Sequence, residues 1–229
     1  MGAVCSETSH RCVLLFALPA RQEARAKRLS RAEALFDYSR RRIAAAVAEL
    51  PGVDLLVLPQ RGGGFGERLE NAFSDARALG YGEIVVVPGD VPRLGARELA
   101  RAFALLAERP VVLGPSPDGG VYLLGCAVDP GPLLAGVRWR GTTVFAELAR
   151  RAGTPGVLEV LEDLDRPADL LHLLRLARAR SLQPDLERLL AGLGTPPPTP
   201  DPSRGPAPRR LFLSSRLLTR GPPAPPFPR

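Results

Sequence analysis

The sequence contains little lysine, asparagine or isoleucine. Lys27 is the only lysine among 31 basic residues, and the 229 residues include one asparagine and two isoleucines. This combination indicates a GC-rich coding sequence in which arginine replaces lysine. The abundance of arginine is therefore mainly a coding preference and is weak evidence about function.

Cysteine and histidine are also scarce. Three scattered cysteines (Cys5, Cys12 and Cys126) form no Cys-x-x-Cys pair. This excludes a disulfide framework and a zinc site, and a reducing cytoplasm is the simplest location. The two histidines, His10 and His172, offer no arrangement for a serine or cysteine nucleophile.

Long hydrophobic runs are absent. The run Val13–Leu18 is far shorter than the roughly 18 residues that a bilayer span needs. We therefore expect no membrane span and no secretory signal. With 45% hydrophobic and 24% charged residues, the composition is that of a globular protein that can bury one sizeable core.

The net charge of +7 is unevenly distributed along the chain. Residues 1–60 carry 9 basic and 6 acidic groups, residues 61–194 carry 16 and 17, and residues 195–229 carry 6 and 1. The last segment also holds 12 of the 25 prolines, so we expect a disordered Pro/Arg-rich tail. We expect residues 1–11 to be disordered as well, residues 12–194 to form the domain, and nucleic acid not to be the partner.

Strand-like and helix-like segments alternate between residues 12 and 194, beginning with a continuous hydrophobic strand. This alternation predicts an α/β fold with a mostly parallel sheet and helices on both faces. A Ser30–Glu33 capping box predicts one helix start. The expected strands are 12–18, 53–58, 83–87, 110–113, 120–126 and 156–161, and the expected helices are 30–50, 66–79, 95–108, 142–151, 167–180 and 184–193.

Carboxylates follow three of the expected strands. Asp90, Asp118 and the pair Asp163 and Asp165 each stand just beyond a hydrophobic run. Ligands of open α/β sheets bind at this edge, and carboxylate oxygens suit Mg²⁺ or Mn²⁺. The alternative roles are local. Asp90 and Asp118 could form turns, and Asp165 could cap the helix that begins at Pro167.

Basic and glycine-rich segments follow the first two strands. Arg21, Arg25, Lys27 and Arg28 lie in an expected loop after the first strand, where they could meet phosphates or simply be solvated. The segment 60–69 contains several glycines at the start of a helix. Its spacing is not that of a P-loop, but it would allow a nucleotide to approach closely.

These motifs, taken in order, resemble a known family. They include Gly89-Asp90-Val91-Pro92-Arg93-Leu94, the stretch 114–125, Trp139 followed by Thr142-Thr143, and 163–170. Over residues 12–180 they resemble the bacterial glycosyltransferase-A-fold transferases of the radical-SAM/selenodomain-associated transferase 1 type. That family is similar in fold to the molybdenum-cofactor and phospholactate guanylyltransferases.

The resemblance implies a single Rossmann-like glycosyltransferase-A domain over residues 12–194, with a nucleotide at the carboxyl edge and Mg²⁺ or Mn²⁺ on Asp90. Together with the strand-end pattern it defines our candidate site. The expected metal ligands are Asp90 and Asp163, the expected catalytic residues are Asp118 and Asp165, and the expected nucleotide-binding residues are Lys27, Arg28, Gln60, Gly66, Glu67 and Arg68.

The expected function is a cytoplasmic, metal-dependent transferase that uses an activated nucleotide donor and a small-molecule acceptor. Glycosyl transfer from a nucleotide sugar is favoured over guanylyl-type nucleotidyl transfer from a nucleoside triphosphate, which would release pyrophosphate. A third hypothesis is a nucleotide-binding protein with impaired catalysis, because the loop around Lys27 and the residue Gly64 depart from the family pattern.

Overall fold

The computed structural model describes residues 10–29, 32–139, 141–179 and 181–194. Within them, six strands form one sheet in the order β2-β1-β3-β5-β4-β6. The strands are β1 (His10–Leu15), β2 (Val53–Leu56), β3 (Tyr81–Val87), β4 (Val111–Pro115), β5 (Val121–Cys126) and β6 (Gly156–Val157).

All strands of the sheet except β5 run in one direction. β1 pairs in parallel with β2 and β3, and β4 pairs in parallel with β6, whereas β5 is antiparallel to both β3 and β4. The predicted α/β fold with a mostly parallel sheet is therefore confirmed. The reversal of β5 follows from the short connection after β4, which is too short for a crossover helix.

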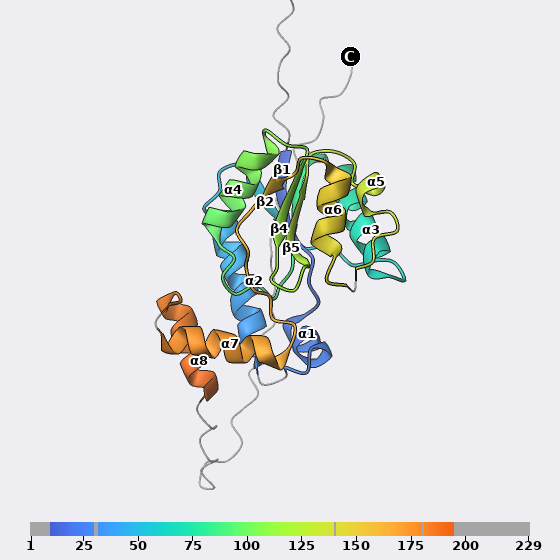
Figure 1. Cartoon of the computed structure of the whole chain (residues 1–229). Helices are drawn as coiled ribbons and strands as arrows, with labels where there is room; N and C mark the ends of the chain where they lie inside the picture. Colours follow the sequence, from blue (N-terminus) through green and yellow to red (C-terminus); the bar gives the residue numbers. More distant parts are fainter. Residues whose placement is uncertain (1–9, 30–31, 140, 180, 195–229) are drawn as a thin grey trace, which may run out of the picture. The chain divides into compact units, whose positions relative to one another are not determined.

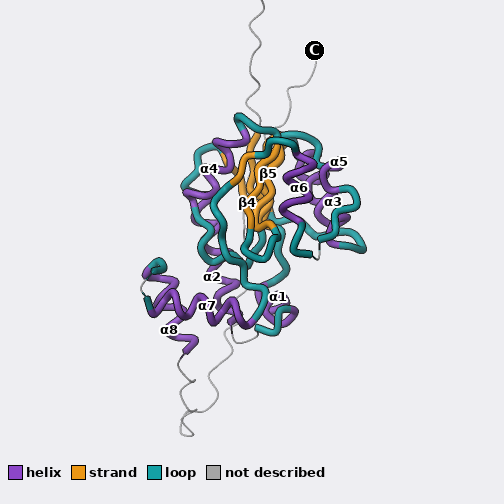
Figure 2. The backbone as a smooth tube through the Cα atoms, viewed as in Figure 1, coloured by secondary structure: helices purple, strands orange, loops and turns teal. Residues whose placement is uncertain are grey.

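Helices cover both faces of the sheet, and three more pack together beyond its carboxyl edge (Figure 1, Figure 2). α2 and α4 lie on one face, and α3, α5 and α6 lie on the other. The helices are α1 (Ala20–Ala26), α2 (Glu33–Ala48), α3 (Phe65–Ala78), α4 (Ala96–Leu106), α5 (Gly131–Leu134), α6 (Val144–Ala152), α7 (Pro167–Arg178) and α8 (Pro184–Gly194).

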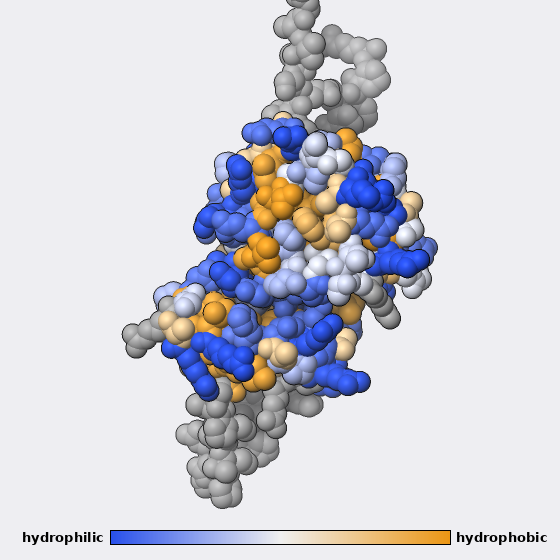
Figure 3. All heavy atoms as spheres, in the orientation of Figure 1, coloured by the Kyte–Doolittle hydropathy of each residue, from blue (hydrophilic) through white to orange (hydrophobic). Residues whose placement is uncertain are grey.

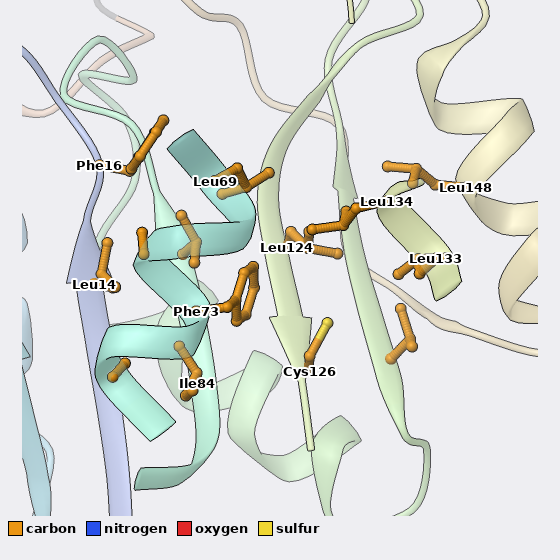
Figure 4. Packing of buried hydrophobic residues seen from close by; sticks show 14 of the residues in the cluster. Leu14, Phe16, Leu69, Phe73, Ile84, Leu124, Cys126, Leu133, Leu134 and Leu148 are labelled. Atoms are coloured by element: carbon orange, nitrogen blue, oxygen red, sulfur yellow. The ribbon is translucent and has the colours of Figure 1, made fainter. Parts of the chain in front are cut away.

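Each face of the sheet has its own hydrophobic core. On the α3 side, Leu14, Phe73 and Leu124 pack together with Leu148 of α6 (Figure 4). On the α4 side, Val13 and Val85 of the sheet pack with Leu99 of α4. Neighbouring strand residues contribute to opposite cores, as the two-residue period of a strand requires. The sequence of a strand that is covered on both faces is therefore a continuous hydrophobic run.

A third core joins α1, α2, α7 and α8. Ala24 of α1 and Phe36 of α2 are fully buried there, and Leu173 of α7 and Leu190 of α8 complete the cluster. This cluster fixes α1 and the start of α7 beside the carboxyl edge of the sheet. α1 and the start of α7 thereby form walls beside that edge, which the sheet alone would not provide.

Several boundaries differ from the sequence prediction. β1 begins at His10, inside the segment expected to be disordered, and β6 contains two residues where six were expected. The expected basic loop after β1 instead contains the helix α1. The Ser30 half of the proposed capping box and the tail 195–229 lie outside the described residues.

Polar and hydrophobic side chains share the surface. On the face in Figure 3, hydrophilic side chains surround a limited band of hydrophobic ones. Exposed large hydrophobic residues include Val157 and Val160 near β6 and Phe65 at the start of α3. Among the described residues, no helix combines the length and the hydrophobicity that crossing a membrane would take.

Candidate functional site

A cavity of about 640 Å³ opens at the carboxyl edge of the sheet. The segments that follow β1, β2, β3, β4 and β6 all contribute to its lining, as the rule for ligand sites in open α/β sheets predicts. Its charged lining residues are Glu23, Lys27, Arg68, Asp90, Asp118, Asp163, Asp165 and Arg166. Its apolar lining residues include Phe16, Leu18, Phe65, Leu69, Trp139 and Val144.

Asp90 reaches the cavity because the strand before it ends abruptly. β3 ends at Val87, and Asp90 is only 6% exposed. The backbone oxygen of Asp90 accepts a hydrogen bond from the amide of Leu164 at 2.9 Å. This bond joins the segment after β6 to the end of β3, and it brings Asp163 and Asp165 into the same cavity as Asp90.

The ammonium group of Lys27 lies among three carboxylates. It contacts Asp90 Oδ2 directly, lies 2.7 Å from Asp165 Oδ1, and lies 3.8 Å from Glu23 Oε1. Burial alone would lower the pKa of Lys27, but Asp90 and Asp165 outweigh burial and raise this pKa. Lys27 therefore stays charged and holds α1 against the ends of β3 and β6.

Asp90 keeps one oxygen without a partner. Its Oδ2 is paired with Lys27, but its Oδ1 is buried and has no hydrogen-bond partner in the described part of the chain. Burial raises the pKa of Asp90, and the charge of Lys27 opposes that increase. An unpartnered buried carboxylate oxygen is costly, so this atom fits a site that receives a cation or a donor from a ligand.

Glu23 also belongs to the site, although no sequence motif pointed to it. It is 8% exposed, and its Oε2 is buried without a hydrogen-bond partner among the described residues. Burial and the nearby charge of Asp90 raise the pKa of Glu23 to about 7. Glu23 precedes Lys27 by four residues, a spacing that brings two side chains together on a helix. The sequence would have predicted the contact between Glu23 and Lys27 only if residues 20–26 had been expected to form a helix.

Asp163 and Asp165 both line the cavity, but in different settings. Burial, followed by the charges of Asp165, Asp90 and Asp118, raises the pKa of Asp163 to about 7. Asp165 does not cap α7, because Arg166 is the N-cap and Asp169 accepts the backbone N–H bonds of residues 165 and 166. Its carboxylate is instead paired with Lys27, so the suggested capping role for Asp165 is wrong.

Asp118 forms the turn between β4 and β5 and also lines the cavity. Its Oδ1 accepts hydrogen bonds from Ser116 Oγ at 2.7 Å and from the Gly120 amide at 2.9 Å. Burial would raise the pKa of Asp118, but these two hydrogen bonds outweigh burial and lower it. The carboxylate therefore remains charged, which makes it a weak proton acceptor.

The segment after β2 contributes two of its predicted nucleotide-binding residues to the cavity. Gln60 and Arg68 line it, and Arg68 Nε is buried without a hydrogen-bond partner among the described residues. Glu67 is not part of the lining, and its Oε2 accepts a hydrogen bond from the Gly63 amide at 2.7 Å. Arg28 is exposed and lies outside the lining.

Three aromatic rings form one wall of the cavity. Phe65 packs edge-on against Phe16, with 5.6 Å between the ring centroids. It also packs against Trp139, with 5.0 Å between the ring centroids. Gly66 explains the position of Trp139, because a Cβ at residue 66 would lie 2.7 Å from the indole Nε1. The structure thus gives Gly66 a packing role, and Trp139 lines the cavity.

The residues present fit a hard divalent cation only in part. No group of three or more His, Cys, Asp or Glu side chains among those described is arranged to hold a metal. The unpartnered Asp90 Oδ1 nevertheless offers one carboxylate ligand. Mg²⁺ is commonly held by one or two carboxylates, with water and substrate phosphates completing its shell. Asp90 thus suits a cation that arrives with a diphosphate.

A solved structure shows the same fold. A protein from Desulfovibrio desulfuricans G20, named "putative nucleotide-diphospho-sugar transferase", aligns with a TM-score of 0.67 and 22% identity over 80% of this chain and 95% of that chain. Rv0371c from Mycobacterium tuberculosis H37Rv aligns with a TM-score of 0.44 and 21% identity over 72% of this chain and 97% of that one.

Sequence comparison provides the family. No functionally curated protein matches this chain. The family described as "Uncharacterized protein conserved in bacteria (DUF2064)" matches residues 22–141, which is just over half of the chain and includes Lys27, Asp90 and Asp118. On that match, the chain belongs to the DUF2064 family.

Proposed function

We propose that this protein is a metal-dependent transferase that uses an activated nucleotide donor, with glycosyl transfer from a nucleotide sugar favoured. The observation that carries the proposal is Asp90, whose buried Oδ1 has no hydrogen-bond partner in the described chain beside the cation Lys27. The likeness of the fold to a protein named as a nucleotide-diphospho-sugar transferase supports the same proposal.

Three of the charged lining residues would bind the donor in this proposal. Asp90 would hold Mg²⁺ or Mn²⁺, which when bound neutralises the charge of the donor diphosphate. Arg68 lines the cavity with an unpartnered buried Nε and would bind phosphate or base oxygens, and Lys27 can exchange a carboxylate for a phosphate without losing an ionic partner.

Asp163 is the stronger candidate for the proton acceptor. Its raised pKa of about 7 suits removal of a proton from an acceptor hydroxyl near neutral pH. Asp118 is held in its turn by two hydrogen bonds, and Asp165 is paired with Lys27. If Asp163→Asn abolishes turnover but preserves metal-dependent nucleotide binding, Asp163 is the base. If both are lost, it is a metal ligand as first expected.

The test combines binding with product analysis. The purified full-length chain is incubated with Mg²⁺ or Mn²⁺ and with panels of nucleotide sugars and nucleoside triphosphates, and calorimetry measures binding. Nucleoside diphosphate release indicates glycosyl transfer, whereas pyrophosphate release indicates nucleotidyl transfer. Wild-type levels of metal-dependent binding in Asp90→Asn would overturn the site assignment.

A second candidate is a nucleotide-binding protein without turnover. The observation that favours it is the Lys27 ion pair, which occupies Asp90 and Asp165 at once. It predicts saturable nucleotide binding with no product from any donor. Metal-dependent turnover with any acceptor would eliminate it.

A further inference from the structure

We propose that the exposed ring of Phe65, with Trp139 inclined beside it, forms a stacking platform for the planar base of a nucleotide at the aromatic wall of the cavity. This inference rests on the proposed function, because it locates one part of the nucleotide donor. It assigns a ligand-contacting role to two aromatic residues that come from distant segments of the chain.

The geometry of the two rings suits a platform. Their centroids are 5.0 Å apart and their planes are inclined by 51°, so a planar base can stack on Phe65 and then meets Trp139 at an angle. Phe16, which is buried, holds Phe65 edge-on from the core side. Phe65 itself remains 44% exposed although it borders a cavity. A large ring that is fixed on one side and exposed on the other offers a surface for stacking.

The position of the indole depends on a glycine. Trp139 precedes α6, whereas Phe65 and Gly66 begin α3, so the wall joins two segments that are distant in the sequence. A side chain at residue 66 would meet the indole at 2.7 Å. The absence of one allows Trp139 to pack close to the backbone of α3.

Polar groups beside the platform favour a base over a purely apolar ligand. Arg68 lies one helical turn beyond Phe65, and its buried Nε has no hydrogen-bond partner among the described residues. Gln60, with one amide donor group and one carbonyl acceptor, also lines the cavity. A ring that carries carbonyl or nitrogen acceptors would satisfy these groups, whereas a hydrocarbon would leave Arg68 unpaired.

The distribution of charge also fits this placement. The charged lining residues include Lys27 and Asp90, and the aromatic wall forms an apolar part of the same cavity. A nucleoside diphosphate has this same division between a charged diphosphate and a flat base. Base–aromatic stacking is worth about 1–3 kcal/mol per base, and every base has a face that can stack.

The experiment uses the fact that Trp139 is the only tryptophan in the chain. The full-length protein is titrated, with Mg²⁺ present, with nucleoside diphosphates of each base and with inorganic pyrophosphate, and both tryptophan emission and calorimetry are recorded. We expect a nucleoside diphosphate to quench Trp139 and pyrophosphate to leave its emission unchanged. Phe65→Ala should weaken nucleoside diphosphate binding at least about fivefold, the lower end of the stacking energy, and pyrophosphate binding less than about twofold.

Two further variants provide controls. Phe65→Tyr keeps the ring and should restore binding, and Leu79→Ala removes a comparably exposed residue at the other end of α3 and should change nothing. If nucleoside diphosphates bind wild type and Phe65→Ala equally well, or bind without quenching, the platform is overturned while the proposed function survives. If no nucleotide binds wild type, both are overturned.

Discussion

Lys27 Nζ lies 2.7 Å from Asp165 Oδ1, although the two residues lie near opposite ends of the domain in the sequence. The same ammonium group contacts Asp90. One lysine thus connects α1, the end of β3 and the segment before α7. Loss of this cation should affect both the stability of the domain and the way that the cavity receives a ligand.

Lys27→Met should lower the free energy of unfolding by about 3 kcal/mol, because it leaves the carboxylate of Asp90 buried without its counter-ion. The double variant Lys27→Met/Asp90→Asn should recover part of that loss. Urea denaturation measures both effects. The control is Arg28→Met at the exposed neighbouring residue, which should change stability by less than about 0.5 kcal/mol. An equal effect of both single variants would contradict the ion-pair explanation.

Asp163→Asn should make stability less dependent on pH. The pKa of Asp163 is raised to about 7 in the folded state, so between about pH 4 and 7 the folded chain binds a proton that the unfolded chain has lost. Stability therefore falls as the pH rises through this range, and the asparagine variant lacks this contribution.

The pH effect is measured as the unfolding free energy at pH 5, 6, 7 and 8. Relative to wild type, Asp163→Asn should gain stability steadily from pH 5 to pH 7 and then level off. Asp185→Asn is the control, because the hydrogen bond from Tyr38 outweighs burial and lowers the pKa of Asp185 out of this range. Parallel pH profiles for wild type and Asp163→Asn would disprove the prediction.

Gly66→Ala should displace the indole of Trp139 and alter its emission. A Cβ at residue 66 would lie 2.7 Å from Nε1, whereas a Cβ at Gly64, two residues earlier, would meet no atom within 4 Å. Gly64→Ala is therefore the matched control and should leave the emission spectrum unchanged. Identical spectra for all three proteins would show that residue 66 does not position Trp139.

Gly119→Ala should destabilise the turn that holds Asp118 by about 3 kcal/mol or more, because overpacking adds to backbone strain. Gly119 has φ +87°, and an added Cβ would lie 1.9 Å from the backbone oxygen of Thr142. Gly153 has a similar φ of +75° but open space around it, so Gly153→Ala incurs only the backbone strain of about 1–2 kcal/mol. Thermal unfolding of both variants separates the clash from the strain. Equal losses would rule out the clash.

The sequence predicted the fold well because hydrophobic runs and helix boundaries are local signals. Each strand except β6 matched an apolar run, and the strand ends brought Asp90, Asp118, Asp163 and Asp165 to one cavity. β6 was predicted too long because the residues after Val157 follow β4 with isolated hydrogen bonds, such as that from Leu161 to Pro115, rather than a regular ladder.

The sequence could not predict how charges pair across the cavity. Residues 20–26 have a polar, arginine-rich composition, which predicts a loop. They are nevertheless helical, because Ala24 is buried in the third core. That helix buries Glu23 and directs Lys27 to Asp90. Such contacts depend on tertiary packing and have no short-range signature, so neither Glu23 nor the Lys27 ion pair was anticipated.

The two edges of the sheet have a consequence for self-association. An unpaired strand edge can recruit a strand from another chain, and long, flat edges are the most hazardous. Here β6 has two residues and follows Pro155, while β2 has four and is followed by Pro59. Edges this short, bordered by residues that lack an amide donor, give a foreign strand few hydrogen bonds to form. The sheet is thus protected against edge-to-edge aggregation, even though Val157 is half exposed.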